Sequence, residues 1–493
     1  MIYNFNLGIG WASSGVEYAQ IYRARMFRNI GVDAKFVFTD MFPSENMEHM
    51  TKNIGFLDSE VIWLYTFFTD FKTAPVTYSL SDLEKTFTDL NYTKTREGKI
   101  CRYVFGGSNN FYTAYMVNDH DDFVHRVEMV SNGFLIRKDY FTYGRVYSEY
   151  YAPLDNKAHL YHRRFFNENG SVAYEEIIDN DRVMYKFKDK ILCSKEEFVG
   201  YMVSQLNLTS DDVVLIDRST DIGQSIIMNC KPARVGTVVH ADHFSEKDTN
   251  EDYILWNNFY EYEFNMHKHI DFYICSTQAQ SDLMVQQFEK YYGVTPCVYT
   301  IPVGSLPELK YPKENRKPFS LITASRLASE KHVDWICKAV IQARSEVPEL
   351  SLDIYGEGGE KSKLETIIRD NNASSYIHLM GQHDLSEVYQ NYEAYIAGST
   401  SEGFGLTLME AVGGGLPIIG FDVRYGNPTF IRNGENGYLI DLPEEDKDRI
   451  EALRKGIVDL FKQDLEKCHS VSYEVAKDFL TSNVQEKWRE AVC

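Results

Sequence analysis

The sequence predicts an α/β protein with two doubly wound halves and an antiparallel β meander inserted into the first half. Three observations support this expectation. Short apolar segments alternate with helical segments towards both ends of the 493-residue chain. From about 98 to 192, apolar and polar residues alternate instead, as in β-strands. A charged stretch with several prolines, 304–318, separates the two α/β parts. A chain of this length is expected to form two to four domains.

The first half opens with a strand, a glycine-rich loop, a helix and a second strand. Apolar residues at helical spacing between Val16 and Ile30 predict the helix, and Gly31 ends it. The α/β rhythm returns after about residue 205, with the apolar strands D-V-V-L-I-D, V-G-T-V-V-H and D-F-Y-I-C-S. We therefore expect 1–45 plus 205–303 to form one Rossmann-like domain with a parallel sheet.

The inserted domain, 46–204, has the sequence pattern of antiparallel strands. Segments such as F-Y-T-A-Y-M-V and H-R-V-E-M-V-S-N-G-F-L-I alternate over short stretches. The pairs Asn132-Gly133 and Asn169-Gly170 predict two hairpins with type I′ turns, which need positive φ at both central residues.

The second half, 319–470, again alternates strands and helices, beginning at F-S-L-I-T-A-S-R. It predicts a second Rossmann-like domain. Residues 471–493 are expected to be helical, and the sequence leaves open whether they cross back to the first half. Ligands of such sheets bind beyond the carboxyl ends of the strands, so two facing halves place the predicted site in the cleft between them.

Composition narrows the class of protein. The formal net charge of −21 argues against nucleic-acid binding, which depends on clustered Lys and Arg. No segment has the 18 or so consecutive apolar residues of a membrane span, and the N-terminus lacks the features of a signal peptide. The eight cysteines, among them Cys275 and Cys337 in apolar runs, show no C-x-x-C spacing. We expect reduced thiols and a cytoplasmic protein.

The segment S-E-G-F-G-L-T-L-M-E contains the most informative pair of carboxylates. Glu402 follows a predicted strand in a loop opened by Gly403 and Gly405, and Glu410 lies in the helix that begins near Leu406. Free amides at a helix start receive anions, and the glycines let a ligand approach the backbone. The two glutamates either contact different parts of one elongated ligand or are ordinary surface acids, and their spacing alone does not decide.

Two further loops at strand ends contain candidate ligand-binding residues. Arg326 and Lys331, in A-S-R-L-A-S-E-K, provide two cations suited to a diphosphate leaving group, unless they are solvated surface charges. Gln382 and His383, in G-Q-H-D, are candidates to hold a base or a phosphate. The alternative is a plain loop in which Asp384 caps the next helix.

The segment V-V-H-A-D-H-F places His240, Asp242 and His243 at the end of a strand. His-x-x-His occurs in metal sites, but no further ligand cluster with the right spacing is evident. His240 therefore either hydrogen-bonds a sugar hydroxyl or has a structural role.

The N-terminal glycines are a weaker signal. Gly8, Gly10 and Gly15 do not form G-x-G-x-x-G, because position 13 is Ser. Asp40 lies roughly where a dinucleotide site needs an acid, so a dehydrogenase remains an alternative. A glycine loop that opens a helix suits a phosphate or sugar contact equally well.

Together these motifs resemble the retaining GT-B glycosyltransferases of the glycogen-synthase-like family, family four. Arg326, Lys331 and the E-x(7)-E pair Glu402 and Glu410 carry the likeness, over roughly 1–45 and 205–493. A narrower, full-length likeness is to the A-type (GtfA-like) transferases of Gram-positive bacteria. N-L-G-I-G-W-A-S-S-G-V-E-Y-A-Q, Y-I-L-W-N-N and S-T-S-E-G-F-G-L-T-L-M-E-A carry it, together with the meander.

The resemblance implies a GT-B fold and a specific activity. The chain would transfer N-acetylglucosamine from UDP-GlcNAc, with retention, to Ser/Thr hydroxyls of a serine-rich repeat adhesin, as the first step of its O-glycosylation before accessory secretion. One alternative is the same chemistry with UDP-glucose as donor. Others are a non-catalytic, chaperone-like GT-B subunit and a GT-B phosphorylase with pyridoxal phosphate.

The resemblance also implies roles for particular residues. Four are expected to be catalytic: Arg326, Lys331, Glu402 and His240. Ten are expected to bind the donor: Gly15, Val16, Glu17, Tyr18, Gln382, His383, Gly403, Phe404, Gly405 and Glu410. The two cations would grip the UDP diphosphate, the first glutamate would contact the donor sugar and the second would hold the ribose.

No metal or other cofactor is expected, because the cations and helix amides of the family stabilise the diphosphate charge. The inserted β domain is implied to bind the polypeptide acceptor and to associate with a partner, and its strand edges and aromatics are compatible with an extended peptide. Its aromatics alternatively fill one face of the sheet. The partner is either a homologous B-type subunit or a second copy, and peripheral association with the inner membrane face is left open.

Overall fold

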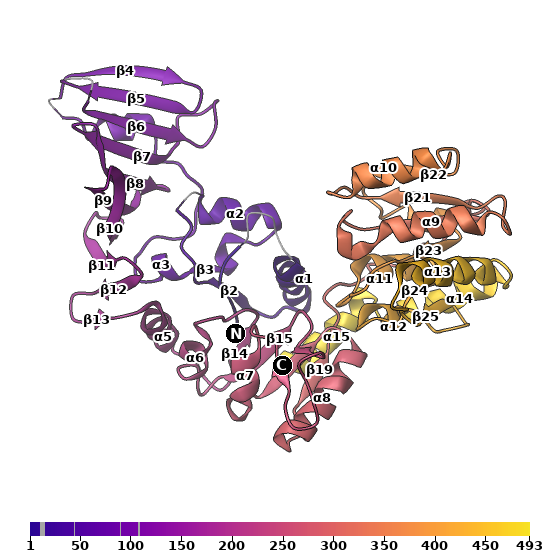
Figure 1. Ribbon diagram of the computed structural model, residues 1–493. Coiled ribbons are helices and arrows are strands. Elements are labelled where there is room, and N and C mark those ends of the chain that lie inside the picture. Colours follow the sequence, from indigo (N-terminus) through magenta and orange to yellow (C-terminus); the bar gives the residue numbers. More distant parts are fainter. Residues whose placement is uncertain (10–14, 44, 89, 107–108) are drawn as a thin grey trace. The chain divides into compact units, whose positions relative to one another are not determined.

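The computed structural model describes residues 1–9, 15–43, 45–88, 90–106 and 109–493. Contacts divide the chain into two compact units. Unit 1 comprises Met1–Ala24, Val32–Thr237 and Asn258–Asp271, and unit 2 comprises Arg25–Gly31, Val238–Asn257 and Phe272–Cys493. This division does not follow the domain bounds drawn from the sequence, which stay a prediction. The predicted α/β class with parallel sheets and one antiparallel sheet is confirmed (Figure 1).

The first parallel sheet has the strand order β19-β18-β15-β14-β1-β2-β3. Its strands are β1 (Ile2–Asn6), β2 (Ala34–Phe38), β3 (Val61–Trp63), β14 (Val213–Ile216), β15 (Arg234–Val239), β18 (Phe272–Cys275) and β19 (Val298–Thr300). They are short apolar runs with few exposed positions, as expected for a parallel sheet that is covered on both faces. β1 pairs with β2 and with β14, so that Ile2 lies opposite both Ala34 and Val213.

Several helices accompany this sheet. They are α1 (Gly15–Ile30), α2 (Met47–Ile54), α3 (Leu64–Phe67), α5 (Lys195–Gln205), α6 (Gly223–Ile227), α7 (Glu261–Asn265) and α8 (Gln278–Tyr292). The short helix α4 (Leu80–Glu84) instead packs Leu80 and Leu83 against strands of the inserted antiparallel sheet. The helix predicted from Val16 to Ile30 is α1. A short antiparallel pair, β16 (Phe244–Ser245) with β17 (Leu255–Trp256), follows β15.

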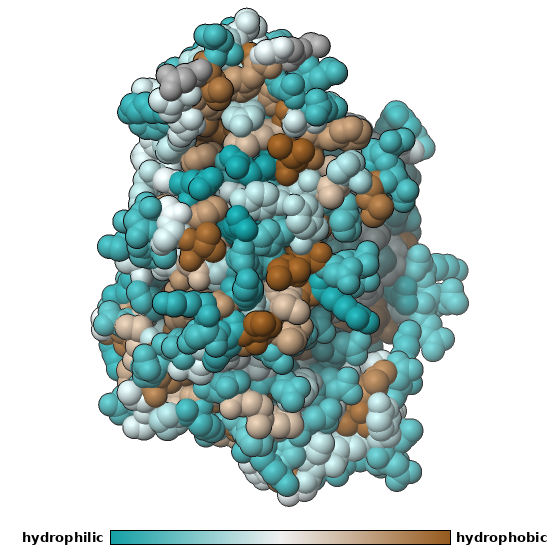
Figure 2. All heavy atoms as spheres, turned by 90° about the vertical axis from the view of Figure 1, so that its left-hand side faces the viewer, coloured by the Kyte–Doolittle hydropathy of each residue, from teal (hydrophilic) through white to brown (hydrophobic). Residues whose placement is uncertain are grey.

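The inserted segment forms a ten-stranded antiparallel sheet in which neighbouring strands follow chain order, as a meander does. The strands are β4 (Tyr92–Glu97), β5 (Ile100–Phe105), β6 (Phe111–Met116), β7 (Val124–Ser131), β8 (Phe134–Phe141), β9 (Arg145–Leu154), β10 (Lys157–Phe166), β11 (Val172–Asp179), β12 (Arg182–Lys186) and β13 (Ile191–Leu192). Figure 2, in which the left-hand side of Figure 1 faces the viewer, shows apolar residues dispersed among polar ones on that face. Alternation in the sequence therefore indicated the correct sheet type.

The two predicted hairpin turns have different outcomes. Asn132 and Gly133 join β7 and β8 with φ of 50° and 82°, as a type I′ turn requires. The prediction of the same turn at Asn169-Gly170 is wrong, because there positive φ is confined to Gly170. The loop is five residues long, and Gly170 N–H donates to the carbonyl of Asn167, which moves the tight turn one residue towards the N-terminus.

An aromatic cluster joins the meander to α5 within unit 1. Phe198 of α5 stacks on Tyr185 of β12 with ring centres 4.1 Å apart, and Tyr174 of β11 lies 5.4 Å away. The Tyr174 hydroxyl donates to the backbone carbonyl of Tyr65 in α3 at 2.7 Å. All four side chains are buried. The meander is therefore continuous with the core beneath it.

The second parallel sheet, in unit 2, has the order β22-β21-β20-β23-β24-β25. Its strands are β20 (Ser320–Ala324), β21 (Ser351–Tyr355), β22 (Ile377–Gly381), β23 (Ala394–Ile396), β24 (Ile418–Phe421) and β25 (Gly437–Ile440). In chain order this is 3-2-1-4-5-6, the arrangement of a Rossmann fold. The order reverses between β20 and β23, which marks the position where such folds bind ligands.

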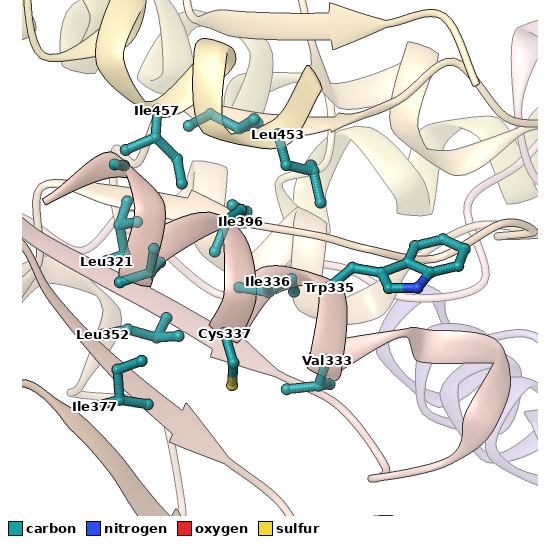
Figure 3. Close-up of a cluster of buried hydrophobic side chains, with 14 of the residues drawn as sticks. Leu321, Val333, Trp335, Ile336, Cys337, Leu352, Ile377, Ile396, Leu453 and Ile457 are labelled. Atoms are coloured by element: carbon teal, nitrogen blue, oxygen red, sulfur yellow. The ribbon is translucent and has the colours of Figure 1, made fainter. Parts of the chain in front are cut away.

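Helices cover both faces of this sheet. They are α9 (Val333–Ala343), α10 (Lys361–Asp370), α11 (Leu406–Gly413), α12 (Gly426–Phe430), α13 (Asp446–Leu460) and α14 (Leu465–Lys477). The last helix, α15 (Thr481–Val492), instead contacts β19 and α1. One core cluster lies under α9, α10 and α13, and Figure 3 shows Ile336 and Cys337 of α9 among side chains of the strands and Leu453 and Ile457 of α13. A second cluster lies under α11, α12 and α14.

The C-terminal residues 471–493 fall in two helices, α14 and α15, rather than one. Trp488 of α15 packs edge-on against Phe27 of α1 with ring centres 5.3 Å apart, so the last helix contacts an element from the start of the chain within unit 2. Among the described residues, no helix is long and apolar enough to span a membrane.

Candidate functional site

The carboxyl ends of β20 and β23 place two predicted site segments at the reversal of the second sheet. Arg326 and Lys331 follow β20, and Glu402 follows β23. Gln382 and His383 follow β22 at the same edge of the sheet. The order of the strands explains why residues up to 76 positions apart meet there, because parallel strands end at one edge.

Lys331 and Glu402 form an ion pair. The Lys331 Nζ lies 2.6 Å from Glu402 Oε2, and the two side chains are 18% and 20% exposed. The Lys331 side chain comes from a 3₁₀ turn, Ser329–Lys331, and the Glu402 side chain from the loop before α11. Neither side chain is the freely solvated surface charge that the sequence left open. Partial burial strengthens the attraction of such a pair relative to an exposed one.

The loop that carries Glu402 is shaped by Gly405. This residue has φ of 86° and stands directly before α11, which begins at Leu406 as expected. A Cβ at this position would lie 2.6 Å from Leu408 Cδ1 and 3.2 Å from Glu402 Cγ. The neighbouring Phe404 side chain is buried against Phe430. The glycine therefore allows the tight turn that presents Glu402.

Glu410 lies on α11 with its carboxyl group partly buried. Burial raises the pKa of this carboxyl group, and the Tyr389 hydroxyl, which donates to Oε2 at 3.0 Å, opposes that shift. The side chain is thus held in one place by a buried tyrosine and is not an ordinary surface acid. A fixed carboxylate of this kind is suited to accept hydrogen bonds from ligand hydroxyls.

A pocket at the ends of β20, β21 and β22 brings together three predicted donor-site residues: Arg326, Gln382 and His383. It is open to solvent, and its space measures about 640 Å³ with that open solvent included. The other lining residues are Ala324, Ser325, Tyr355, Gly356, Glu357, Leu385 and Thr407. The Arg326 side chain is 79% exposed and pairs with Glu330 at 3.2 Å, so it is able to turn towards a ligand. Its position at the strand ends of a Rossmann sheet is the one where such folds bind nucleotides.

Sequence reasoning missed Tyr355 and Thr407 as pocket residues. The signal was the segment Y-G-E-G-G after β21, since a Cβ at Gly356 would lie 1.9 Å from the carbonyl oxygen of Ser325. That glycine allows the loops after β20 and β21 to touch. The Tyr355 ring meets His383 edge-on with ring centres 5.9 Å apart, so His383 forms part of the wall.

The histidines after β15 have separate environments. His243 is completely buried and its Nε2 lies 2.7 Å from Gln287 Oε1. Burial lowers the pKa of His243 to about 4, so the ring is neutral at ordinary pH. His240 is partly exposed, and its carbonyl oxygen lies 3.8 Å from where Gly403 would carry a Cβ. The Glu402 loop therefore passes beside His240.

Across the described residues, no group of three or more His, Cys, Asp or Glu side chains is arranged to hold a metal ion. His243, one half of the possible His-x-x-His pair, contacts Gln287 and the hydroxyl of Tyr425. These contacts indicate that His243 has a structural role.

The predicted donor-binding residues Gly15 to Tyr18 form the first turn of α1 in unit 1. Val16 and Glu17 are buried, and Tyr18 is exposed. Gly10 and Ser13 of the glycine-rich segment lie outside the described residues. The Asp40 carboxylate accepts from Lys195 Nζ at 2.6 Å, which engages the acid that the dinucleotide alternative would use.

Comparison with known proteins identifies the family. The profile "Glycosyl transferases group 1" matches residues 308–478, and "GtfA extended beta-sheet domain" matches 93–189. The "UDP-N-acetylglucosamine--peptide N-acetylglucosaminyltransferase GtfA subunit" of Streptococcus agalactiae is 52% identical over 492 residues, which cover 99% of this chain and 97% of that protein. This chain belongs to the GtfA family.

Solved GtfA structures have the same fold. The crystal structure of a GtfA/B complex contains a chain 51% identical to this one, with a TM-score of 0.96 and coverage of 100% and 99%. The pneumococcal O-GlcNAc transferase GtfA, solved with UDP and GlcNAc, is 49% identical, with a TM-score of 0.85 and coverage of 100% and 98%. The predicted GT-B architecture and glycosyltransferase class of this GtfA-family chain are confirmed.

Proposed function

We propose that this chain transfers N-acetylglucosamine from UDP-GlcNAc to serine or threonine hydroxyls of a polypeptide. The observation that carries the proposal is the edge of the second sheet. There a pocket with Arg326, Gln382 and His383 lies at the same edge of the sheet as the Lys331–Glu402 ion pair. The family relationship supports it, since a relative named for this activity is 52% identical over nearly the whole chain.

Each part of the site has a proposed role. Arg326 and Lys331 stabilise the charge that grows on the diphosphate as the sugar leaves. Glu402 contacts the donor sugar beside His240, and Glu410, fixed by Tyr389, accepts hydrogen bonds from the ribose. Transfer with retention then proceeds on one face of the sugar, and the chemistry is proposed to need no metal.

The acceptor and the partner are proposed from the relatives. A GtfA chain was solved as a GtfA/B complex, which supports association of this chain with a homologous B-type subunit. The proposed acceptor is a serine-rich repeat adhesin, glycosylated in the cytoplasm before secretion. The antiparallel sheet provides long strands and aromatic side chains suited to an extended polypeptide.

The test is direct. The purified chain, alone and with a B-type subunit, is incubated with a Ser/Thr-rich peptide and either UDP-GlcNAc or UDP-glucose, and the peptide is weighed by mass spectrometry. We expect addition of N-acetylhexosamine from UDP-GlcNAc and no such product with Arg326→Ala. Exclusive addition of hexose from UDP-glucose, or wild-type transfer by Arg326→Ala, would overturn the donor or the site.

A further inference from the structure

Tyr425 lies between the two segments proposed to meet the donor sugar. Its backbone pairs with the Glu402 loop: Tyr425 N–H donates to the Glu402 carbonyl at 2.5 Å, and Glu402 N–H donates to the carbonyl of Arg424 at 3.1 Å. Its side chain reaches the segment after β15, where the hydroxyl lies 3.3 Å from His243 Nδ1. All of these residues belong to unit 2.

The direction of this hydrogen bond follows from the other side of the histidine ring. Gln287 Oε1 is an acceptor, so the His243 Nε2 that faces it at 2.7 Å carries the proton. Nδ1 of the neutral ring is then an acceptor within reach of the Tyr425 hydroxyl, which also lies beside the carboxyl group of Asp242 as a second acceptor. Tyr425 is 1% exposed and His243 is completely buried, so water does not replace either partner.

Two further contacts join the same segments. Arg424 pairs with Glu246 at 2.6 Å, and its guanidinium lies 4.9 Å from the centre of the Phe244 ring. The segment after β24 is thus fixed against residues 243–246 at three places. The contacts of Arg424 and of Tyr425 both continue into the backbone of Glu402, and of the two residues Tyr425 reaches the buried His243 ring.

We propose that Tyr425 is a positioning residue that holds Glu402 in register with the segment of His240, through its hydroxyl and the buried pair His243–Gln287. The inference rests on the proposed function of Glu402 and His240. It assigns to Tyr425 an effect on turnover that is separate from nucleotide binding, because the pocket of Arg326 and Tyr355 is lined by other loops. Catalytic groups tolerate displacements of only about 0.5 Å.

The experiment compares Tyr425→Phe with wild type. Turnover and the KM for UDP-GlcNAc are measured in peptide transfer, and UDP affinity is measured by calorimetry. Loss of one positioning hydrogen bond is expected to lower kcat about tenfold while KM and the UDP Kd stay within about twofold. His243→Asn is expected to lower kcat similarly, and the double variant is expected to be no worse than either single variant.

Tyr473→Phe is the matched control, because its partly buried hydroxyl donates to the backbone carbonyls of Lys310 and Gly414, away from these segments. It is expected to keep wild-type kcat. Turnover within twofold of wild type for Tyr425→Phe overturns the inference, as does additive loss in the double variant or equal loss in Tyr473→Phe. If wild type transfers no sugar although UDP binds, the proposed function fails instead.

Discussion

Lys331 and Glu402 neutralise each other at 2.6 Å while both side chains keep some contact with water. A diphosphate that binds Lys331 must share this cation with a carboxylate that repels it. The carboxylate therefore opposes binding of the nucleotide, which fits the proposed role of Glu402 in sugar transfer rather than in affinity. Differential stabilisation of this kind raises turnover rather than ground-state binding.

We expect Glu402→Gln to bind UDP more tightly and to transfer sugar poorly. Removing the charge frees Lys331 for the diphosphate, which should lower the Kd by about fivefold at low salt, and the gain should shrink at high salt. Transfer should fall by about 100-fold or more. Calorimetry at two salt concentrations and a transfer assay measure both effects.

Glu330→Gln is the control, since it removes an exposed partner of Arg326 and should change UDP affinity little. Weaker UDP binding by Glu402→Gln would contradict the view that this carboxylate opposes the nucleotide.

At the scale of elements, the start of α11 depends on a left-handed residue in a crowded position. Gly405 has φ of 86°, and the space for a Cβ is occupied by Leu408 and Glu402. Gly434 has a similar φ of 79° with no atom within 4 Å of a Cβ position. Alanine substitutions at the two glycines therefore distinguish the free-energy cost of a left-handed backbone from the additional cost of steric crowding.

Gly434→Ala should destabilise the protein by about 1 kcal/mol through backbone strain alone and leave transfer unchanged. Gly405→Ala should cost more and should also reduce transfer, because the methyl group displaces Glu402. Denaturant unfolding and initial transfer rates distinguish these outcomes. Equal loss of stability and equal activity in the two variants would show that crowding at Gly405 has no consequence.

The helix α14 contains a buried histidine that links stability to pH. His469 Nδ1 donates to the carbonyl of Gly415 at 2.8 Å, and burial lowers the pKa of His469 to about 4. The unfolded chain takes up a proton near pH 6.5, whereas the folded chain does not. The contribution of the neutral His469 ring to the free energy of unfolding is therefore complete above pH 6.5, and it is lost as the pH falls from there towards 4.

We expect His469→Gln to lose about 2 kcal/mol less stability than wild type when the pH is lowered from about 7.5 to about 5. Glutamine keeps a donor for Gly415 but does not titrate. Chemical unfolding at the two pH values provides the measurement. The same pH dependence in variant and wild type would exclude His469 as a source of the acid sensitivity.

The sequence predicted the helices and strands better than it predicted which of their residues contact one another. Periodicity was sufficient for α1, for the meander and for the second parallel sheet, because those patterns are local. It missed Tyr355 at the end of β21 and Thr407 in α11, which line the pocket only because strand order places these two elements at one edge of the sheet. It also assigned the wrong turn at Asn169, since the length of a hairpin loop is set by the pairing of both strands. The roles of Glu402 and His240 stay predictions.

For the whole molecule, the meander shares its core with helical elements of unit 1. Phe198 of α5 packs against Tyr185 and Tyr174 of the sheet and is completely buried. Large aromatic residues in such clusters bury much apolar area, so a change in α5 is transmitted to the strands. The meander and α5 are thus expected to unfold as one cooperative part.

Phe198→Ala should destabilise unit 1 by about 3–5 kcal/mol, the usual cost of removing a buried phenylalanine. Hydrogen exchange should accelerate in β11 and β12 together with α5, and should change little in the second parallel sheet. Phe134→Ala, at a residue that is 49% exposed on β8, is the control and should have little effect. Faster exchange confined to α5 would refute the shared core.

The pairing of β1 has a consequence for the order of events during synthesis. Ile2 lies opposite Val213. More than two hundred further residues must therefore be synthesised after β1 before its neighbour β14 emerges from the ribosome. Each meander strand instead pairs with the next along the chain, and such short-range pairing is fast. We therefore expect the nascent chain to complete the inserted sheet first. Until then, one side of β1 is an unpaired strand edge that a chaperone would need to shield.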